Sequence, residues 1–424
     1  MEIVIALIFV LLILVGVPIA FCLAATGILG LLFFTNIPLA LPAGNLYHSL
    51  DTYTLIAVPL FFIAGGTMAA GGLARRLVNF AQAITAFLRG GLGVAAVVAC
   101  GIFASITGSS TTALVAIGSV MYGAMLKAGY SPKFSAGVLT TSGSLGILIP
   151  PSVPMIVFAH IANISVGKMF LAGVVPGIIV VILLSVVAYL TADSKEAENE
   201  HFSWRQVGVT FWEGLWAILL PVVVLGGIYG GLFTVTEAAG VSVIYALFVE
   251  LVIYRELTWR DLPRLFDEAV LLSGAIIIII ACATFFGQYL TLQQLPQKLA
   301  ALTTEHIDSR FALLLAINAL LLFVGTFMDI ISAMLILAPI LIAVATRFQI
   351  DLIHLGIIFV INMEIGFMTP PLGLNLFAAQ AITKMKIGEL VRAVVPTVGV
   401  LLVVLLAVTF FPEVALWLPN WFYR

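Results

Sequence analysis

The chain has 424 residues, of which 62% are hydrophobic and only 9% are charged, and its formal net charge is −2. Its mean hydropathy of +1.23 lies far outside the range of soluble globular domains and excludes that class. The charges are scattered through short connections, with no basic tail. We therefore expect an integral membrane protein that crosses the bilayer many times and has no nucleic-acid partner.

The first apolar run, residues 3–35, contains Gly16 and Pro18 and fits either one kinked span or two short spans. Because no basic region precedes this run, we expect a retained helix and not a cleaved signal. Spanning the membrane takes about 20 apolar residues, and further apolar segments of suitable length follow. They cover residues 53–71, 92–126, 134–161, 169–192, 214–233, 236–254, 269–291, 309–346, 352–382 and 393–411.

Two of these segments are too long for one straight span and carry a polar, glycine-containing centre. The segment 92–126 has basic and no acidic residues at both ends, so the positive-inside rule places both ends in the cytoplasm. The ends of 309–346 have no basic excess, which places both on the opposite face. These assignments predict two re-entrant hairpins that enter from opposite sides, which is an inverted-topology repeat.

Two other segments are interrupted by a diproline, at residues 150–151 and 370–371, and the two interruptions are 220 residues apart (370 − 150 = 220). Gly146 and Gly366 precede them in the same register. Proline cannot donate to the helix ladder and glycine frees the backbone, so each segment is predicted to be a broken helix. Paired breaks in corresponding halves of a membrane protein are the best sequence indication of a transporter's binding site.

The expected fold is an all-α polytopic membrane protein built from inverted repeats, with two re-entrant hairpins and two broken helices. We predict a first repeat in 53–192, with hairpin 92–126 and broken helix 134–161, and a second repeat in 269–411, with hairpin 309–346 and broken helix 352–382. Scaffold helices are expected before and between the repeats, in 1–52 and 193–268, and an interfacial tail in 412–424.

Each half pairs a hairpin tip with a break, and such places expose the oxygen donors that a hard cation such as Na⁺ prefers. Residues 105–112 are expected to face the break at 142–150, and residues 325–329 the break at 364–370. Small and hydroxyl-bearing residues also let membrane helices pack closely, which is the alternative explanation of either tip alone. The duplication favours two Na⁺ sites, whose candidate ligands are Ser105, Thr107, Ser109, Ser110, Gly143, Gly146, Pro150, Gly325, Thr326, Asp329, Gly366 and Thr369.

The helix ends at the breaks also present free N–H groups and a positive dipole end, which suit an anionic substrate. Asp329 either ligates a cation or caps a helix at the second tip. Glu364 either belongs to an ion or substrate pathway or pairs with a neighbouring polar group. The candidate substrate contacts are Thr111, Ser144, Ser152, Glu364 and Asn375.

Three further charged residues are interpreted structurally. Glu237 follows Thr234 at the start of an apolar segment, where an acidic residue suits the helix dipole, so capping is its expected role. Arg75 and Arg76 are interpreted as determinants of orientation in the membrane and not as substrate ligands.

Four motifs stand at the tips and breaks: Gly108-Ser109-Ser110-Thr111-Thr112-Ala113, Gly146-Ile147-Leu148-Ile149-Pro150-Pro151-Ser152, Gly325-Thr326-Phe327-Met328-Asp329 and Gly366-Phe367-Met368-Thr369-Pro370-Pro371-Leu372-Gly373. Together they resemble the large membrane subunit of TRAP (tripartite ATP-independent periplasmic) transporters, and the resemblance covers essentially the whole chain.

The resemblance implies a sodium-driven importer of organic anions, such as C4-dicarboxylates or sialic acid, in the bacterial inner membrane. It implies a fold similar to divalent-anion/sodium symporters, with a scaffold and a transport domain that moves like an elevator. It also implies two partners, a small four-helix membrane subunit, expected as a separate protein, and a periplasmic substrate-binding protein that delivers the carboxylate.

Two other classes compete with this interpretation. A self-sufficient sodium/anion symporter would need no soluble partner. An intramembrane hydrolase would need a base beside its serine, and no serine has His160 at a convincing spacing. We therefore expect a transporter with no catalytic residues and no organic cofactor.

Overall fold

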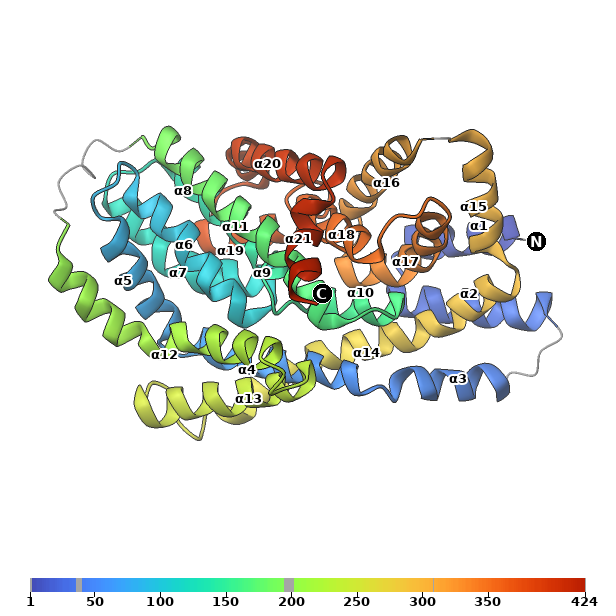
Figure 1. The fold of residues 1–424 in the computed structure, drawn as a ribbon, viewed down its shortest axis with the longest axis horizontal. Helices are drawn as coiled ribbons and strands as arrows, with labels where there is room; N and C mark the ends of the chain where they lie inside the picture. The colour runs from blue at the N-terminus through green and yellow to red at the C-terminus, as the bar shows by residue number, and fades with distance from the viewer. Residues whose placement is uncertain (1, 36–39, 194–201, 308, 424) are drawn as a thin grey trace.

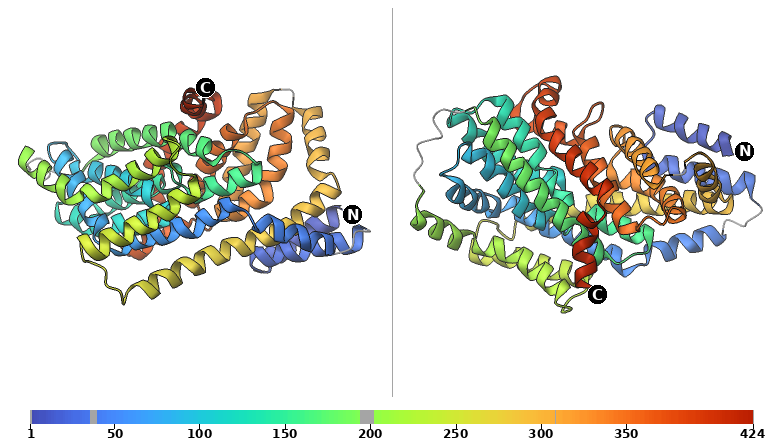
Figure 2. Two further views of the ribbon diagram at one scale, coloured as in Figure 1. Left: turned by 60° about the horizontal axis from the view of Figure 1, so that its bottom comes forward. Right: turned by 45° about the horizontal axis from the view of Figure 1, so that its top comes forward.

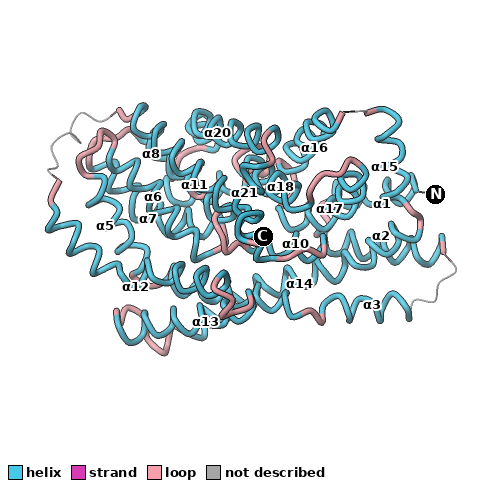
Figure 3. Tube along the Cα trace, viewed as in Figure 1, coloured by secondary structure: helices cyan, strands magenta, loops and turns pink. Residues whose placement is uncertain are grey.

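The computed structural model describes residues 2–35, 40–193, 202–307 and 309–423, and all regular structure in these ranges is helical (Figure 1; Figure 3). Eight stretches among these residues are long and apolar enough to cross a membrane. A helix rises about 1.5 Å per residue, so 20 residues cover the roughly 30 Å of a hydrocarbon core. The eight stretches are Tyr53–Ala70, Pro132–Ala162, Val166–Thr191, Trp204–Tyr229, Val235–Ile253, Leu262–Leu292, Ile330–Arg347 and Ile387–Phe410. The chain is a polytopic all-α membrane protein.

One side of the molecule is a layer of helices, and its longest member lies along the lower edge of the left panel of Figure 2. This long-helix layer comprises α2 (Ile19–Phe34), α3 (Ala40–Leu50), α4 (Ala57–Ala70), α12 (Trp204–Tyr229), α13 (Val235–Phe248) and α14 (Leu262–Leu292). Glycines allow α2 and α14 to approach closely, because a Cβ built on Gly27 would lie 2.6 Å from the Phe286 amide nitrogen. Small residues at such contacts are typical of membrane helix packing.

The other side contains two similar groups of helices. The first tip–break unit consists of α6 (Gly91–Thr107), α7 (Ser110–Lys127), α8 (Pro132–Ser142), α9 (Leu145–Leu148), α10 (Val153–Ala162) and α11 (Val166–Thr191). The second tip–break unit consists of α16 (Arg310–Gly325), α17 (Ile330–Arg347), α18 (Leu352–Phe367), α19 (Leu374–Thr383) and α20 (Ile387–Phe410). Each begins with two helices joined by a short turn and continues with a helix that is broken at a cis diproline.

The two units keep the 220-residue offset in their helix bounds. Both ends of α7 map onto the ends of α17 (330 − 110 = 220 and 347 − 127 = 220). The units also interlock, because α8 packs against α20 and α11 against α18. The hydroxyls of Thr141 and Thr397 lie 2.6 Å apart at the first of these contacts. The helical repeat read from the diprolines therefore extends well beyond them.

The breaks differ from the prediction in their position. The first unit is interrupted twice, after Ser142 and after Leu148, around the one-turn helix α9. In the second unit α18 stays helical through Phe367, so Glu364 and Gly366 lie in helix and not in unwound backbone. Proline removes a donor only at its own position, and the residues before it can complete the last helical turn.

The N-terminal run is two helices, α1 (Glu2–Leu14) and α2, which pack against each other around the turn at Gly16. Gly16 has a φ of 85°, which glycine adopts at little cost. The run therefore consists of two separate helices and not of one kinked helix. Residues 36–39 lie outside the described ranges, and the stretch between the first two predicted apolar segments contains the helix α3 (Ala40–Leu50).

Several amphipathic helices were not predicted, because their polar faces interrupt the long apolar runs that indicate a spanning helix. They include α5 (Leu73–Thr85), which packs against α6 and α12, and α15 (Leu295–His306), which packs against α17. The predicted domain boundary at 268–269 falls inside α14, which begins at Leu262. The remaining elements are η1 (Tyr53–Ile56), the π-helical turn η3 (Val249–Ile253) and α21 (Glu413–Phe422).

Candidate ion and substrate site

The first tip, residues 105–112, lies directly against the first break, residues 142–151. A Cβ on Gly146 would lie 2.7 Å from the Ser109 carbonyl carbon and 2.9 Å from Ser110 Cα. Such contacts are closer than side chains allow, so only glycine lets the two backbones meet here. The amide of Val153, just after the break, donates to the Gly108 carbonyl over 3.5 Å.

The second tip, residues 325–329, meets the second break, residues 364–371, in the same way. A Cβ on Gly366 would lie 2.6 Å from Gly325 Cα. Beyond the break, the amide of Leu372 donates to the Thr326 carbonyl over 3.0 Å. Both predicted pairings of a tip with a break are therefore present as backbone contacts.

The first tip supplies mostly hydroxyl oxygens. Ser105, Thr107 and Ser110 are all less than a tenth exposed. The Ser105 hydroxyl donates to the Ile102 carbonyl over 2.6 Å, so its oxygen lone pairs remain available to a further partner. Ser109 caps α7, because its Oγ accepts the Thr112 amide over 3.4 Å.

The second tip contains a carboxylate at the matching position. Asp329 caps α17, because its Oδ1 accepts the Ser332 amide over 3.0 Å and its Oδ2 accepts the Ser332 hydroxyl. Capping was one of two predicted roles for Asp329, and its carboxylate oxygens keep lone pairs that the cap does not use. The Thr369 hydroxyl donates to the Ile365 carbonyl over 2.9 Å, and the Thr369 amide donates to the Gly366 carbonyl over the same distance.

Glu364 connects the two units. Its Oε1 accepts the Ser110 hydroxyl and the Asn375 side-chain amide, each over 2.7 Å, and the same amide nitrogen lies 2.6 Å from Ser110 Oγ. All three residues are at most 2% exposed. Glu364 thus pairs with neighbouring polar groups, which was one of its two predicted roles, and it joins the second break to the first tip.

The predicted substrate contacts differ in their access to a cavity. Ser144, Ser152, Glu364 and Asn375 are at most 2% exposed and line none of the described cavities, and each has a buried oxygen without a partner among the described residues. Thr111 does line a cavity of about 540 Å³, which lies between the α4–α5 turn and the first turns of α7. A second cavity of about 620 Å³ lies between α14 and the residues His160, Leu335 and Pro339.

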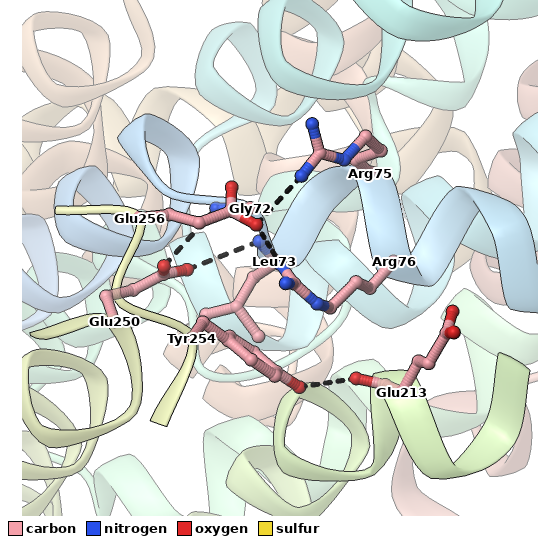
Figure 4. A network of polar contacts seen from close by, with 8 residues as sticks. All are labelled: Gly72, Leu73, Arg75, Arg76, Glu213, Glu250, Tyr254 and Glu256. Atoms are coloured by element: carbon pink, nitrogen blue, oxygen red, sulfur yellow. Dashed lines mark hydrogen bonds and ion pairs between the residues drawn. The ribbon is translucent and has the colours of Figure 1, made fainter. Parts of the chain in front are cut away.

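Arg75 and Glu256, which line the cavity at Thr111, belong to a charged cluster (Figure 4). The sequence pattern had indicated only an orientation role for Arg75 and Arg76. Arg75 and Arg76 both contact Glu256, at 2.8 Å and 2.6 Å. The carboxylate of Glu250 accepts the amides of Gly72 and Leu73 at the start of α5. No local pattern indicated that residues near 250 pack against the α4–α5 turn.

One cap prediction is confirmed outright. The Thr234 hydroxyl accepts the Glu237 amide over 3.3 Å, while the Glu237 carboxylate accepts the Thr234 amide over 2.8 Å. This reciprocal capping box begins α13.

Known proteins resemble this chain along most of its length. Residues 6–414 match the family described as "Tripartite ATP-independent periplasmic transporter, DctM component". The chain is 44% identical to the C4-dicarboxylate TRAP transporter large permease protein DctM of Pseudomonas aeruginosa over 400 residues, which cover 94% of each chain. It is 33% identical to the sialic acid TRAP transporter large permease protein SiaM of Vibrio cholerae, over 96% of each chain.

A solved structure supports the fold independently. The Alcanivorax borkumensis YdaH transporter superposes with a TM-score of 0.61 at 15% sequence identity, over 89% of this chain and 87% of the other. That likeness concerns the fold alone. The extent of the family match and the identity to the two permeases show that the chain belongs to the DctM family, the large permease subunits of TRAP transporters.

Proposed function

We propose that this chain is the permease of a sodium-coupled importer that carries an organic carboxylate across the bacterial inner membrane. The observation that carries the proposal is the duplicated backbone contact of a tip with a break, Gly146 against Ser109 and Gly366 against Gly325. Irregular backbone at membrane depth is tolerated only inside protein or around a cavity, and such places bind ions and substrates in transporters.

The donor atoms at both contacts fit Na⁺, since they are carbonyl, hydroxyl and carboxylate oxygens. When bound there, Na⁺ supplies positive charge that favours the binding of an anion nearby. The proposed ligands of the first site come from Ser105, Thr107, Ser109, Ser110, Gly143, Gly146 and Pro150, and those of the second from Gly325, Thr326, Asp329, Gly366 and Thr369.

We further propose that the carboxylate occupies the cavity at Thr111. The hydroxyl of Thr111 and the N-terminal end of α7 suit a negative group, because a helix N-terminus carries a partial positive charge. Relatives named for C4-dicarboxylate and for sialic acid support the carboxylate class. The identity is higher to the former, 44% against 33%, so a C4-dicarboxylate such as succinate is the first substrate to test.

For the mechanism we propose an elevator. The two interlocked tip–break units would move as one body against the long-helix layer and expose the site alternately to the two sides of the membrane. The repeated helix bounds and the contacts of α8 with α20 support a single moving body. The hairpins would re-enter from opposite faces, as the charges at their ends indicate.

The proposed partners are a small membrane subunit and a periplasmic substrate-binding protein. The test is uptake of labelled succinate and sialic acid into proteoliposomes that contain this chain and its small subunit, with an inward Na⁺ gradient. We expect uptake to require both Na⁺ and the soluble binding protein. Robust uptake without the soluble protein would favour the alternative, a self-sufficient sodium/anion symporter.

A further inference from the structure

The cavity at Thr111 has one cationic wall. Arg75 lines it from α5, while Thr111, Thr112 and Ser119 line it from α7. Glu256 is the acidic residue on this wall, and it faces the same arginine. An anion that enters the cavity therefore meets the Arg75 guanidinium, which is already paired with the Glu256 carboxylate.

The two neighbouring arginines differ in how firmly they are held (Figure 4). The Arg76 side chain is 19% exposed, contacts Glu256 at 2.6 Å, and has its guanidinium 3.7 Å from the centre of the Tyr254 ring. The Arg75 side chain is 60% exposed, and its recorded polar contact is the one to Glu256. Arg76 is thus a fixed part of the packing, while Arg75 extends toward the cavity.

This difference makes Arg75 available to another carboxylate. An ion pair exposed to water contributes little, because solvent screens it and both side chains lose freedom. If Arg75 turns away, Glu256 keeps Arg76 as its partner, so no buried charge is left alone. An incoming carboxylate can therefore replace Glu256 at Arg75 without a large penalty.

The backbone that carries Arg75 is well anchored. Glu250 accepts the amides of Gly72 and Leu73 at 3.3 Å and 3.2 Å, which fixes the start of α5. The loop that carries Glu256 is closed by Asp261, which accepts the Thr258 hydroxyl and amide. These hydrogen bonds hold the pKa of Asp261 below its ordinary value. Exchange of partners at Arg75 then requires only side-chain motion.

We infer that Arg75 binds the carboxylate group of the substrate on the cytoplasmic side, in exchange for Glu256, before release. A guanidinium offers a planar fork of donors that matches a carboxylate better than a lysine ammonium does. This inference rests on the proposed function and on the cytoplasmic assignment of the α4–α5 turn. It adds a residue that selects an anionic group at the release step.

The test measures the affinity on the inner side of the membrane. Proteoliposomes are preloaded with increasing unlabelled succinate, and uptake of labelled succinate is measured with the binding protein outside, which selects one orientation. The measured quantity is the lumenal concentration of unlabelled succinate that gives the half-maximal effect on uptake of labelled succinate. Arg75→Ala should raise it about tenfold, the loss expected for one charge-assisted hydrogen bond. Arg75→Lys should raise it about threefold.

The companion variant should change the same quantity in the opposite direction. Glu256→Gln removes the carboxylate that competes for Arg75, so it should lower the half-maximal lumenal succinate concentration about threefold. The matched control is Arg89→Ala, which removes an exposed arginine after α5 that does not line the cavity, and it should leave the lumenal value unchanged. Thermal midpoints in detergent check that each variant folds, and Arg75→Gln replaces Arg75→Ala if the latter does not.

An unchanged lumenal value in Arg75→Ala, or a rise in Glu256→Gln, would overturn the inference, since the cluster would then be purely structural. Failure of the proposed function would give a different result, because the unmodified chain itself would then show no Na⁺-driven uptake.

Discussion

The two tip–break units have the same backbone plan and different side chains at equivalent positions. Both tips meet their breaks through a glycine, and both second helices of the hairpins begin at a capping residue. The cap is the neutral Ser109 in the first unit and the charged Asp329 in the second, 220 residues later (329 − 109 = 220). Ser144 of the first break likewise corresponds to Glu364 of the second (364 − 144 = 220).

The comparison shows which features the shared architecture requires. Close backbone contact needs glycine and an interrupted helix needs proline, so these residues are the same in both units. Charge does not affect the backbone path, and the two carboxylates of this comparison, Asp329 and Glu364, stand in the second unit. Glu364 brings a carboxylate to the first tip, because it accepts the Ser110 hydroxyl. Four predictions examine this division between shared backbone and divergent side chains.

The largest effect is expected for the contact glycines. Gly146→Ala and Gly366→Ala should each abolish Na⁺-driven uptake, because the added Cβ overlaps the backbone of the facing tip, and should destabilise the protein by about 1–3 kcal/mol. The control is Gly123→Ala in α7, whose Cβ meets nothing within 4 Å. Uptake and thermal midpoints are the measurements, and active alanine variants would show that the tips need not touch the breaks.

The second largest effect concerns Glu364. Glu364→Ala leaves Ser110 and Asn375 without their buried acceptor, so we expect a loss of about 2–4 kcal/mol in the free energy of unfolding. Glu364→Gln keeps an acceptor oxygen and should lose about 1 kcal/mol. Ser144→Ala, at the equivalent position of the first break, is the control and should change stability least. Equal losses at positions 144 and 364 would contradict the difference between the units.

The third prediction separates capping from cation binding at the two matched caps. Asp329→Ser keeps an N-cap oxygen and removes the charge, so stability should change by less than about 1 kcal/mol. The sodium concentration for half-maximal uptake should nevertheless rise several-fold if Asp329 ligates Na⁺. Ser109→Ala, which loses the cap oxygen but no charge, should cost about 1 kcal/mol. An unchanged sodium requirement in Asp329→Ser would leave Asp329 as a cap alone.

The last prediction perturbs the protein least, because it uses exposed positions. In a cysteine-free background, Arg89→Cys and Lys133→Cys flank the first hairpin and should be labelled from the same, cytoplasmic side. Arg347→Cys, at the end of the second hairpin, should be labelled from the opposite side. Labelling of Arg89→Cys and Lys133→Cys from different sides would refute the inverted arrangement of the two units.

The existence of the turns and breaks, though not the residues at which each helix ends, could be predicted because their causes are local. A few adjacent residues are enough to interrupt or begin a helix, as at both diprolines, at Gly108 and at the capping box of Thr234. The predicted hairpin ends, which followed from the apolar runs, lie within one residue of the starts of α6 and α16 and of the ends of α7 and α17. The amphipathic helix α5 was missed, since a search for apolar runs does not detect a helix with one polar face.

The membrane class, the 220-residue repeat and the positions of the glycines and prolines at the breaks can be derived from the sequence, because they depend on composition and on local backbone geometry. The hydrogen bond from Ser110 to Glu364, 254 residues away, and the pairing of Glu256 with Arg75 and Arg76 arise only in the folded chain. Such contacts join segments far apart in the chain, and they depend on how whole helices pack, which no short stretch of sequence specifies.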